Sequence, residues 1–198
     1  MTTHGRRHHR RLPVSRIDAS DFLLHTLRPT LKSIGLYSLE AEKLLMGTAA
    51  QESNFRNVSQ NGGGPAKGLF QMETITHDDL WTRVVRRHAT LELRIRALLN
   101  GAAPSAPMLL GNAAYAVAMC RVKYWSVRDP VPRDLVGWSQ YWKRWYNTPL
   151  GKGAPSEFIA NWHLYVDPVY ARLPDDADQA EDQAPSLGVP AFPFTIVI

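Results

Sequence analysis

The sequence of 198 residues is poor in cysteine and in long apolar runs, and both shortages exclude classes of protein. A single cysteine, Cys120, cannot form an intramolecular disulfide, and the Cys/His spacings of structural zinc sites are missing. No apolar run approaches the ~20 residues that cross a bilayer, and no glycine-rich stretch ends like a phosphate loop. We therefore predict no membrane span, no metal site and no cofactor.

Charge is distributed unevenly along the chain, whose formal net charge is +5. Residues 1–16 carry five arginines and no acid, whereas residues 174–198 carry five acids and no base. This pattern predicts a basic N-terminal arm (1–16), one central domain (17–173), and an acidic linker with a hydrophobic C-terminal tail (174–198). The arm has no apolar segment behind its arginines, so no secretory signal peptide is predicted.

Apolar periodicity predicts that the central domain is mainly α-helical. Helices are expected over 17–36 with a kink at Pro29, over 39–53 after a Ser38 cap, from Thr76 to His88, from Thr90 to about Asn100, over 108–127, over 134–147, and after a Ser156 cap. The stretch from Asn57 to Glu73 holds four glycines and a proline, which indicates a small glycine-rich β-hairpin or a tight loop. Chemistry is expected near that loop, because functional side chains concentrate on loops held by a rigid scaffold.

Glu52 stands out as a candidate catalytic acid. It continues the apolar side of the helix that contains Leu44, Leu45 and Ala49, close to the C-terminal end of that helix. Apolar packing and the negative end of the helix dipole both raise a carboxyl pKa, which is the condition for a general acid at neutral pH. The alternative is a structural ion pair with an arginine such as Arg56, and periodicity alone does not decide between the two.

Three sequence motifs resemble those of soluble lytic transglycosylases and goose-type lysozymes. They are AAQESNF (Ala49–Phe55), GLFQ (Gly68–Gln71) and NAAYAVA (Asn112–Ala118), in that order. The later stretches YWKRWYNTPLGKG (141–153) and SEFIANW (156–162) are similar to a subgroup of lysozyme-like proteins of tailed bacteriophages. The resemblance implies a lysozyme-like helical domain that cleaves the β-1,4 bond between N-acetylmuramic acid and N-acetylglucosamine in peptidoglycan.

The resemblance also implies roles for individual residues. Glu52 would protonate the glycosidic oxygen and, in a transglycosylase, would then accept the proton of the C6 hydroxyl as the 1,6-anhydro ring closes. Ser53 and Gln71 would hydrogen-bond the sugar or orient Glu52, and Tyr115 would orient the acid from the opposite wall. Such positioning is a large part of what an enzyme with one carboxylate can offer.

Two hairpin residues have open roles in the sequence. If the segment is extended, Glu73 would share a strand face with Gln71 and could act as a second carboxylate for hydrolysis. Acidic residues also prefer the first turn of helices, and this preference favours Glu73 as the acid that starts the next helix. Lys67 would either neutralise the carboxylates of the muramyl lactate and peptide or be solvated.

Two further patterns have structural interpretations that we prefer. Aromatic residues recur at helical spacing over 138–146, which predicts a core face rather than a sugar-stacking wall (Trp138, Tyr141, Trp142, Trp145, Tyr146). Cys120 lies in an apolar helical run, where a free thiol is an inert small hydrophobe rather than a nucleophile.

The sequence thus predicts a peptidoglycan-cleaving lytic transglycosylase or lysozyme carried in a phage particle, in the tail, baseplate hub or connector, and acting on the host cell wall during genome entry. Its expected partners are glycan strands and, through the basic arm and hydrophobic tail, other virion proteins. One alternative is a structural virion protein that keeps a lysozyme-like fold with little activity. Another is nucleic-acid binding through the arginine arm, which predicts steep salt dependence.

Overall fold

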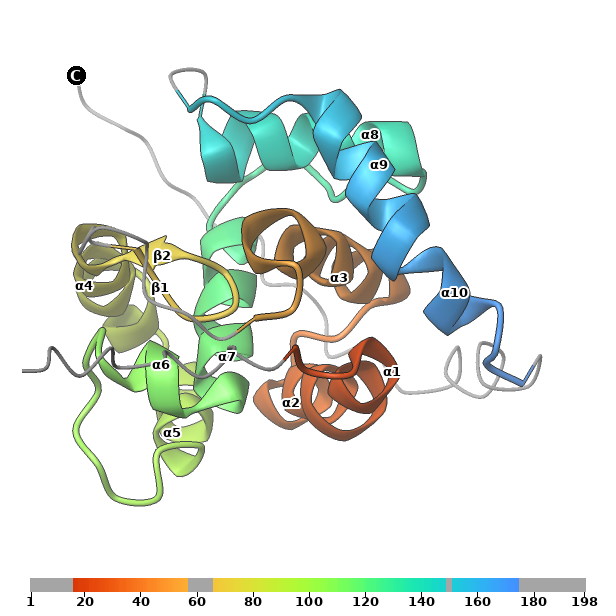
Figure 1. Cartoon of the computed structure of the whole chain (residues 1–198). Helices are drawn as coiled ribbons and strands as arrows, with labels where there is room; N and C mark the ends of the chain where they lie inside the picture. The colour runs from red at the N-terminus through yellow and green to blue at the C-terminus, as the bar shows by residue number, and fades with distance from the viewer. Residues whose placement is uncertain (1–15, 57–65, 149–150, 175–198) are drawn as a thin grey trace, which may run out of the picture.

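The computed structural model describes residues 16–56, 66–148 and 151–174, and these residues form a mainly helical body with one two-stranded antiparallel sheet (Figure 1). This agrees with the predicted mainly α class with a small hairpin. Residues 1–15 of the predicted arm and 175–198 of the predicted tail lie outside the described part. Across the described ranges, no helix is both long enough and apolar enough to cross a membrane.

The chain enters the body through a broken helix. Asp18 caps α1 (Ala19–Phe22), a π-helical turn follows over Leu23–Leu27, and α2 (Arg28–Ile34) ends at Gly35 with φ of 75°. Pro29 lies in the first turn of α2, where its missing N–H and fixed φ are tolerated. The helix predicted over 17–36 is thus divided into three segments, and its departure from α-helical geometry is the π turn, which ends two residues before Pro29.

Helix α3 (Leu39–Ser53) lies at the centre of the body, between α1 and α2 on one side and α8 and α9 on the other (Figure 1). Its bounds are those predicted, because the Ser38 hydroxyl accepts a hydrogen bond from the Ala41 N–H at 3.1 Å, and Asn54 closes the helix in the left-handed conformation. Nine of its residues are buried, so the helix is packed on nearly all sides and not only along one stripe.

Glu42, in the first turn of α3, is completely buried. Its two carboxylate oxygens accept hydrogen bonds from Arg28 Nε at 2.7 Å and Nη2 at 2.9 Å, and Tyr170 Oη donates a third at 3.0 Å. This buried cluster joins α2, α3 and α10 (Asp167–Tyr170). The ion pair and its hydrogen bonds compensate the cost of removing both charges from water.

The last part of the glycine-rich segment forms a hairpin from β1 (Ala66–Lys67) to β2 (Met72–Glu73), with Ala66 opposite Glu73 and Lys67 opposite Met72. Its turn is formed by residues 68–71, whereas the cluster Gly62–Pro65, around which the hairpin was predicted, lies within residues 57–65, outside the described part. Helix α4 (Thr74–Arg83) starts directly after β2, with Glu73 as its N-cap residue. The predicted start at Thr76 was therefore wrong, since the strand passes into the helix without a linker. A 3₁₀ turn over Val85–Arg87 then leads to α5 (Ala89–Ala97).

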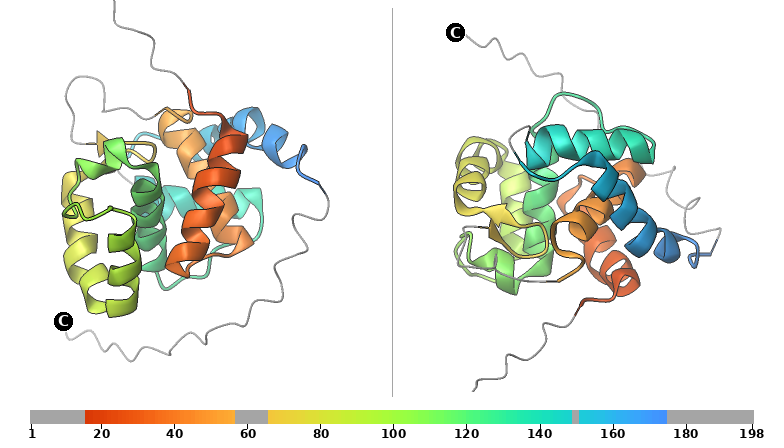
Figure 2. Two further views of the ribbon diagram at one scale, coloured as in Figure 1. Left: turned by 90° about the horizontal axis from the view of Figure 1, so that it is seen from below. Right: turned by 45° about the horizontal axis from the view of Figure 1, so that its top comes forward.

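The predicted helix over 108–127 is two helices, α6 (Met108–Gly111) and α7 (Ala113–Trp125). Asn112 interrupts the run: its extended backbone and its side chain, which accepts a hydrogen bond from the Tyr115 N–H at 2.8 Å, start a new helix. Figure 2 shows α4 and α5 on one side of α7 and α1 to α3 on the other, and α7 contacts both groups. Cys120 is fully buried, and burial raises its pKa, so its thiol stays protonated.

The C-terminal part of the body covers α3. Asp134 caps α8 (Leu135–Trp142), a π-helical turn follows over Lys143–Asn147, and α9 (Pro155–Tyr165) precedes α10. The predicted Ser156 cap was wrong: Pro155 occupies the first turn, and the Glu157 carboxylate accepts a hydrogen bond from the Ala154 N–H at 2.9 Å. Four residues of the aromatic stripe belong to the core as predicted, with Trp142 only 1% exposed, whereas Trp145 is half-buried and packs against that core.

Gly47 sets how closely α3 and α9 approach each other. A Cβ at this position would lie 2.2 Å from Phe158 Cζ, and Phe158 is fully buried and has no room to move. We expect Gly47→Ala to lower the free energy of unfolding by about 1–3 kcal/mol, although alanine is the better helix former. Urea unfolding measures this change. Gly111→Ala is the control, because a Cβ there meets nothing within 4 Å, and an equal loss in both variants would contradict the packing explanation.

Candidate functional site

Glu52 lies in the last turn of α3 with its carboxyl against the aromatic face of α8. The indole N–H of Trp142 donates a hydrogen bond of 2.8 Å to Glu52 Oε1. Burial raises the pKa of Glu52 from its ordinary value of 4.5 to about 7, despite the opposite effects of that hydrogen bond and of the Lys123 charge. At neutral pH the carboxyl is therefore present in both protonation states, and it can donate or accept a proton. Arg56, the partner in the alternative interpretation, is exposed.

The side chains beneath Glu52 are buried in the protein interior. Thr48 lies one helical turn before Glu52 on the same face of α3, and its hydroxyl is 2.8 Å from the hydroxyl of Tyr124 on α7. Thr48 is fully buried and Tyr124 is 1% exposed. A carboxyl above such a surface loses hydration on that side, which is the physical cause of its raised pKa.

Lys123 brings a positive charge to the same region. Its ammonium donates a hydrogen bond of 3.0 Å to the Tyr146 carbonyl and lies 3.9 Å from the centroid of the Tyr146 ring. Burial lowers the pKa of Lys123, while the negative charges of Glu52 and Glu73 act in the opposite direction. Lys123 thus lies within electrostatic range of both carboxylates.

Tyr146 connects the surroundings of Glu52 to the hairpin. Its hydroxyl donates a hydrogen bond of 2.8 Å to the carbonyl of Phe70, inside the GLFQ motif. The π turn after Trp142 carries Tyr146, and the charge of Glu52 contributes to the raised pKa of this phenol, after the larger effects of burial and Cys120. The structure therefore brings the first two motifs together, with Tyr146 between them.

Ser53 and Gln71 were expected to bind the sugar or to orient Glu52, and in the structure both side chains donate hydrogen bonds to nearby backbone. The Ser53 hydroxyl donates to the Ala49 carbonyl at 3.1 Å, and Gln71 Nε2 donates to the Gly68 carbonyl at 2.7 Å. Gln71 has φ of 45° and lies in the turn before β2. The segment is not extended at Gln71, so strand alternation does not place Gln71 and Glu73 on one face.

Tyr115 does not have the position predicted for it. Its hydroxyl is 2.7 Å from His77 Nε2, and His77 Nδ1 is 2.7 Å from the carboxylate of Asp78. Tyr115 is fully buried and His77 is 1% exposed, so this cluster fastens α4 to the start of α7. Lys123, beside Glu52, is eight residues further along α7, about 12 Å at 1.5 Å per residue. The hydroxyl of Tyr115 therefore faces α4 and not the end of α3, where Glu52 lies, so it does not orient Glu52.

Glu73 and Lys67 occupy the two strands of the hairpin. Glu73 is exposed at the N-cap position of α4, which agrees with the preferred helix-start interpretation, and its side chain makes no capping hydrogen bond. Lys67 is half-buried on β1 opposite Met72. Within the described residues, no group of three or more His, Cys, Asp or Glu side chains is arranged to hold a metal ion.

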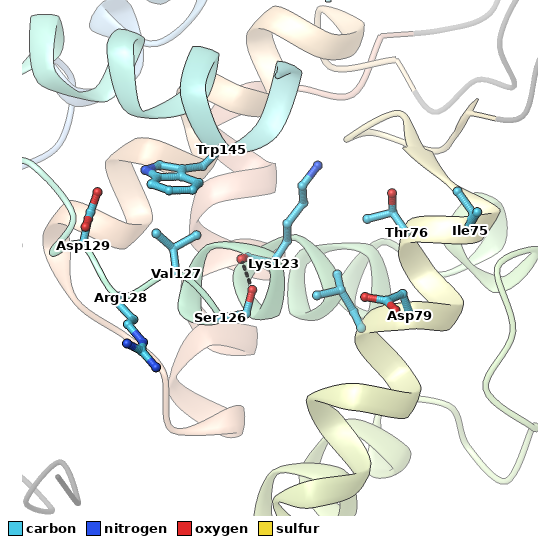
Figure 3. A pocket seen from close by; sticks show the side chains of 10 residues that line it. Ile75, Thr76, Asp79, Lys123, Ser126, Val127, Arg128, Asp129 and Trp145 are labelled. Atoms are coloured by element: carbon cyan, nitrogen blue, oxygen red, sulfur yellow. Dashed lines mark hydrogen bonds between the residues drawn. The ribbon is translucent and has the colours of Figure 1, made fainter. Parts of the chain in front are cut away.

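An open cavity of about 810 Å³ lies between α4, the end of α7 and the π turn over Lys143–Asn147 (Figure 3). Ile75, Thr76 and Asp79 of α4 form one side, and residues 127–129 with Trp145 form the other. Lys123 of α7 and Ser126, the residue after that helix, lie between them. Glu52 does not line this cavity. Lys123 lines the cavity, and its charge also acts on Glu52, so this lysine connects the two regions.

Sequence reasoning missed three residues around Glu52, namely Trp142, Tyr146 and Lys123. The aromatic stripe carried a signal for two of them, because its core face also reaches the end of α3. Nothing in the sequence near Lys123 indicated its role, because a single lysine in a helix does not show which distant side chains it contacts. Its ammonium lies 3.9 Å from the centroid of the Tyr146 ring, which belongs to another element.

We expect Trp142→Phe to raise the pKa of Glu52 further, because the indole N–H stabilises the carboxylate. The upward shift is expected to be up to about one pH unit. Titration of the Glu52 carboxyl followed by NMR measures it. Trp138→Phe is the control, since that indole donates to the Pro132 carbonyl, and an equal shift in both variants would contradict a direct effect.

Comparison with known proteins identifies no relative: no protein-family model, curated protein or solved structure matches this chain. The likeness to lytic transglycosylases and goose-type lysozymes therefore stays a prediction from the motifs.

Proposed function

We propose that this protein cleaves the glycan strands of peptidoglycan, with Glu52 as its general acid and base. The observation that carries the proposal is the desolvated carboxyl of Glu52 with a pKa of about 7, held by an indole hydrogen bond at the end of a buried helix. Perturbed carboxyls of this kind concentrate at catalytic sites. The GLFQ turn, linked to the same region through Tyr146, adds the second motif of the resemblance.

The proposed chemistry uses one proton donor. Glu52 in its protonated form donates a proton to the oxygen of the β-1,4 bond as that bond breaks, and the carboxylate that remains accepts a proton in the second half of the reaction. In a transglycosylase that proton comes from the C6 hydroxyl, whereas in a lysozyme it comes from water. Lys123 stabilises the carboxylate form between these steps, because its positive charge is within range of Glu52.

The test is digestion of purified peptidoglycan followed by mass analysis of the soluble products. Muropeptides with a 1,6-anhydro ring identify a lytic transglycosylase, and muropeptides with a new reducing end and one added water identify a lysozyme. If the folded protein releases neither product from walls of several chemotypes, the proposal is wrong, and the structural virion protein becomes the better hypothesis.

A place in a phage particle is part of the same proposal and rests on the resemblance of residues 141–162 alone. Purified particles, separated by gel and identified by peptide mass, test it. A stoichiometric copy number in particles of an inactive protein would favour the structural alternative.

A further inference from the structure

Trp142, which holds Glu52, is itself enclosed by two neighbours. Its indole N–H donates the hydrogen bond of 2.8 Å to Glu52 Oε1, and its side chain is only 1% exposed. Phe158 of α9 packs against the indole, with 5.6 Å between the ring centroids. Gly153 also lies against it, because a Cβ at this glycine would be 2.6 Å from Cη2 and 3.3 Å from Cζ2 of Trp142. Cζ2 is bonded to the ring carbon that carries Nε1, so Gly153 meets the indole at the edge next to its N–H.

The backbone that carries Gly153 is fastened to the π turn over Lys143–Asn147. Lys143 Nζ donates a hydrogen bond of 2.8 Å to Asn147 Oδ1 and another of 2.7 Å to the Gly151 carbonyl. A Cβ at Gly151 would lie 2.4 Å from the backbone oxygen of Asn147, so glycine permits this close approach. The Lys143 ammonium therefore holds the chain two residues before Gly153.

The tryptophan, the lysine, the asparagine and both glycines belong to 141–153, one of the two stretches that resemble lysozyme-like phage proteins. This stretch contributes no proton donor or acceptor to the proposed chemistry. Its described residues instead form one local arrangement, in which α8 supplies the indole, the π turn supplies the lysine, and the glycines complete the contact. Catalytic geometry has to be held within about 0.5 Å, and supporting contacts of this kind provide that precision.

We propose that Gly153, held in place by Lys143, positions the indole of Trp142 for its hydrogen bond to Glu52. Gly153 and Lys143 are positioning residues, because they act on Glu52 through Trp142. Glycine is required at position 153, since a side chain there would enter the space of the indole edge. The catalytic consequence rests on the proposed function, whereas the placement of the indole does not depend on it.

The test is the Gly153→Ala protein. The new Cβ and the indole must separate by about 1 Å to reach an ordinary carbon–carbon contact of ~3.5 Å, and a displacement of that size breaks a hydrogen bond of 2.8 Å. The bond stabilises the carboxylate, so we expect the pKa of Glu52 to rise by about 0.5–1 pH unit. NMR measures both effects, through the indole N–H signal of Trp142 and the titration of the Glu52 carboxyl.

Gly137→Ala is the matched control. A Cβ at Gly137 would lie 2.5 Å from Pro132 Cβ, which is a similar clash on the same helix as Trp142. We expect this variant to lose stability and to leave the pKa of Glu52 unchanged. The double variant Gly153→Ala/Trp142→Phe is the second control, because without an indole N–H the alanine has no hydrogen bond to break. Its Glu52 pKa is expected to equal that of Trp142→Phe alone.

Three results would overturn the inference. They are an unchanged or lowered pKa of Glu52 in Gly153→Ala, the same rise in Gly137→Ala, and a further rise in the double variant over Trp142→Phe alone.

Lys143→Met removes two hydrogen bonds without adding a clash, and it decides the question if Gly153→Ala does not fold. We expect it to raise the pKa of Glu52 in the same direction by a smaller amount. Lys152→Met is its control, because it removes an exposed lysine charge from the same segment and leaves these hydrogen bonds in place. Equal Glu52 pKa values in the two lysine variants would contradict the role of Lys143.

The proposed function fails separately, and release of products from peptidoglycan measures it. A displaced indole and a raised Glu52 pKa in Gly153→Ala, together with a wild type that releases no product, would leave the positioning intact and remove the enzyme. Product release by the wild type with an unchanged Glu52 pKa in Gly153→Ala would do the reverse.

Discussion

Glu52→Gln is expected to reduce glycan cleavage by about 10²–10⁴-fold, the usual contribution of general acid–base catalysis. Glutamine has the same shape, and its amide oxygen can still accept the hydrogen bond from Trp142 that holds Glu52 at 2.8 Å. The variant therefore keeps the local packing and loses only the transferable proton. Release of soluble muropeptides by wild type and variant at equal concentration measures the effect.

The same substitution is expected to stabilise the fold at alkaline pH. The folded pKa of about 7 lies above the ordinary 4.5, so the native state binds a proton more tightly than the unfolded chain does. Stability contributed by the protonated carboxyl is present below pH 4.5 and is lost as pH rises through 7. The loss corresponds to about 3 kcal/mol at most, and glutamine, which does not ionise, avoids it.

Thermal or urea unfolding of both proteins at pH 4 and pH 8 tests this linkage. The two proteins are expected to be similar at pH 4, and the variant is expected to be the more stable one at pH 8. Loss of activity without any stability gain at pH 8 would show that the Glu52 carboxyl is not desolvated as described. A destabilised variant at both pH values would mean that the residue has a packing role instead.

The second large effect is expected at the buried ion pair of Arg28 and Glu42. Arg28→Met leaves the Glu42 carboxylate, which is fully buried, with only the Tyr170 hydroxyl as its hydrogen-bond partner in this cluster. Breaking a buried pair in this way costs about 3–5 kcal/mol of unfolding free energy. The exposed Arg83→Met is the control: its pair with Asp79 is at the surface and contributes less than about 1 kcal/mol.

The double variant Arg28→Met/Glu42→Leu distinguishes a lost charge partner from lost packing. An apolar pair of similar volume is expected to recover most of the stability, because the uncompensated charge is then absent. Urea unfolding of the two single variants and the double variant completes the cycle. If the double variant is as unstable as the sum of the single ones, the cluster acts through packing and not through charge.

The sequence by itself determined the local structure around the site. Ser38 and Asn54 fix the bounds of α3, because helix caps depend on neighbours within a few residues. The glycine-rich composition of 57–73 predicted a small hairpin in this segment, and the two strands lie in its last part. The candidate acid was identified in the same way, since its place on the apolar side of a helix follows from the 3.6-residue period.

The tertiary structure alone decided which side chains meet. It placed the indole of Trp142, 90 positions away in the sequence, within hydrogen-bond distance of Glu52. It also placed the hydroxyl of Tyr115 against the imidazole of His77 and not against Glu52. It also brought the buried carboxylate of Glu42 to Arg28 of α2. These outcomes depend on how α3, α7 and α8 pack, and a helix period fixes which face a residue occupies without fixing which other helix covers that face.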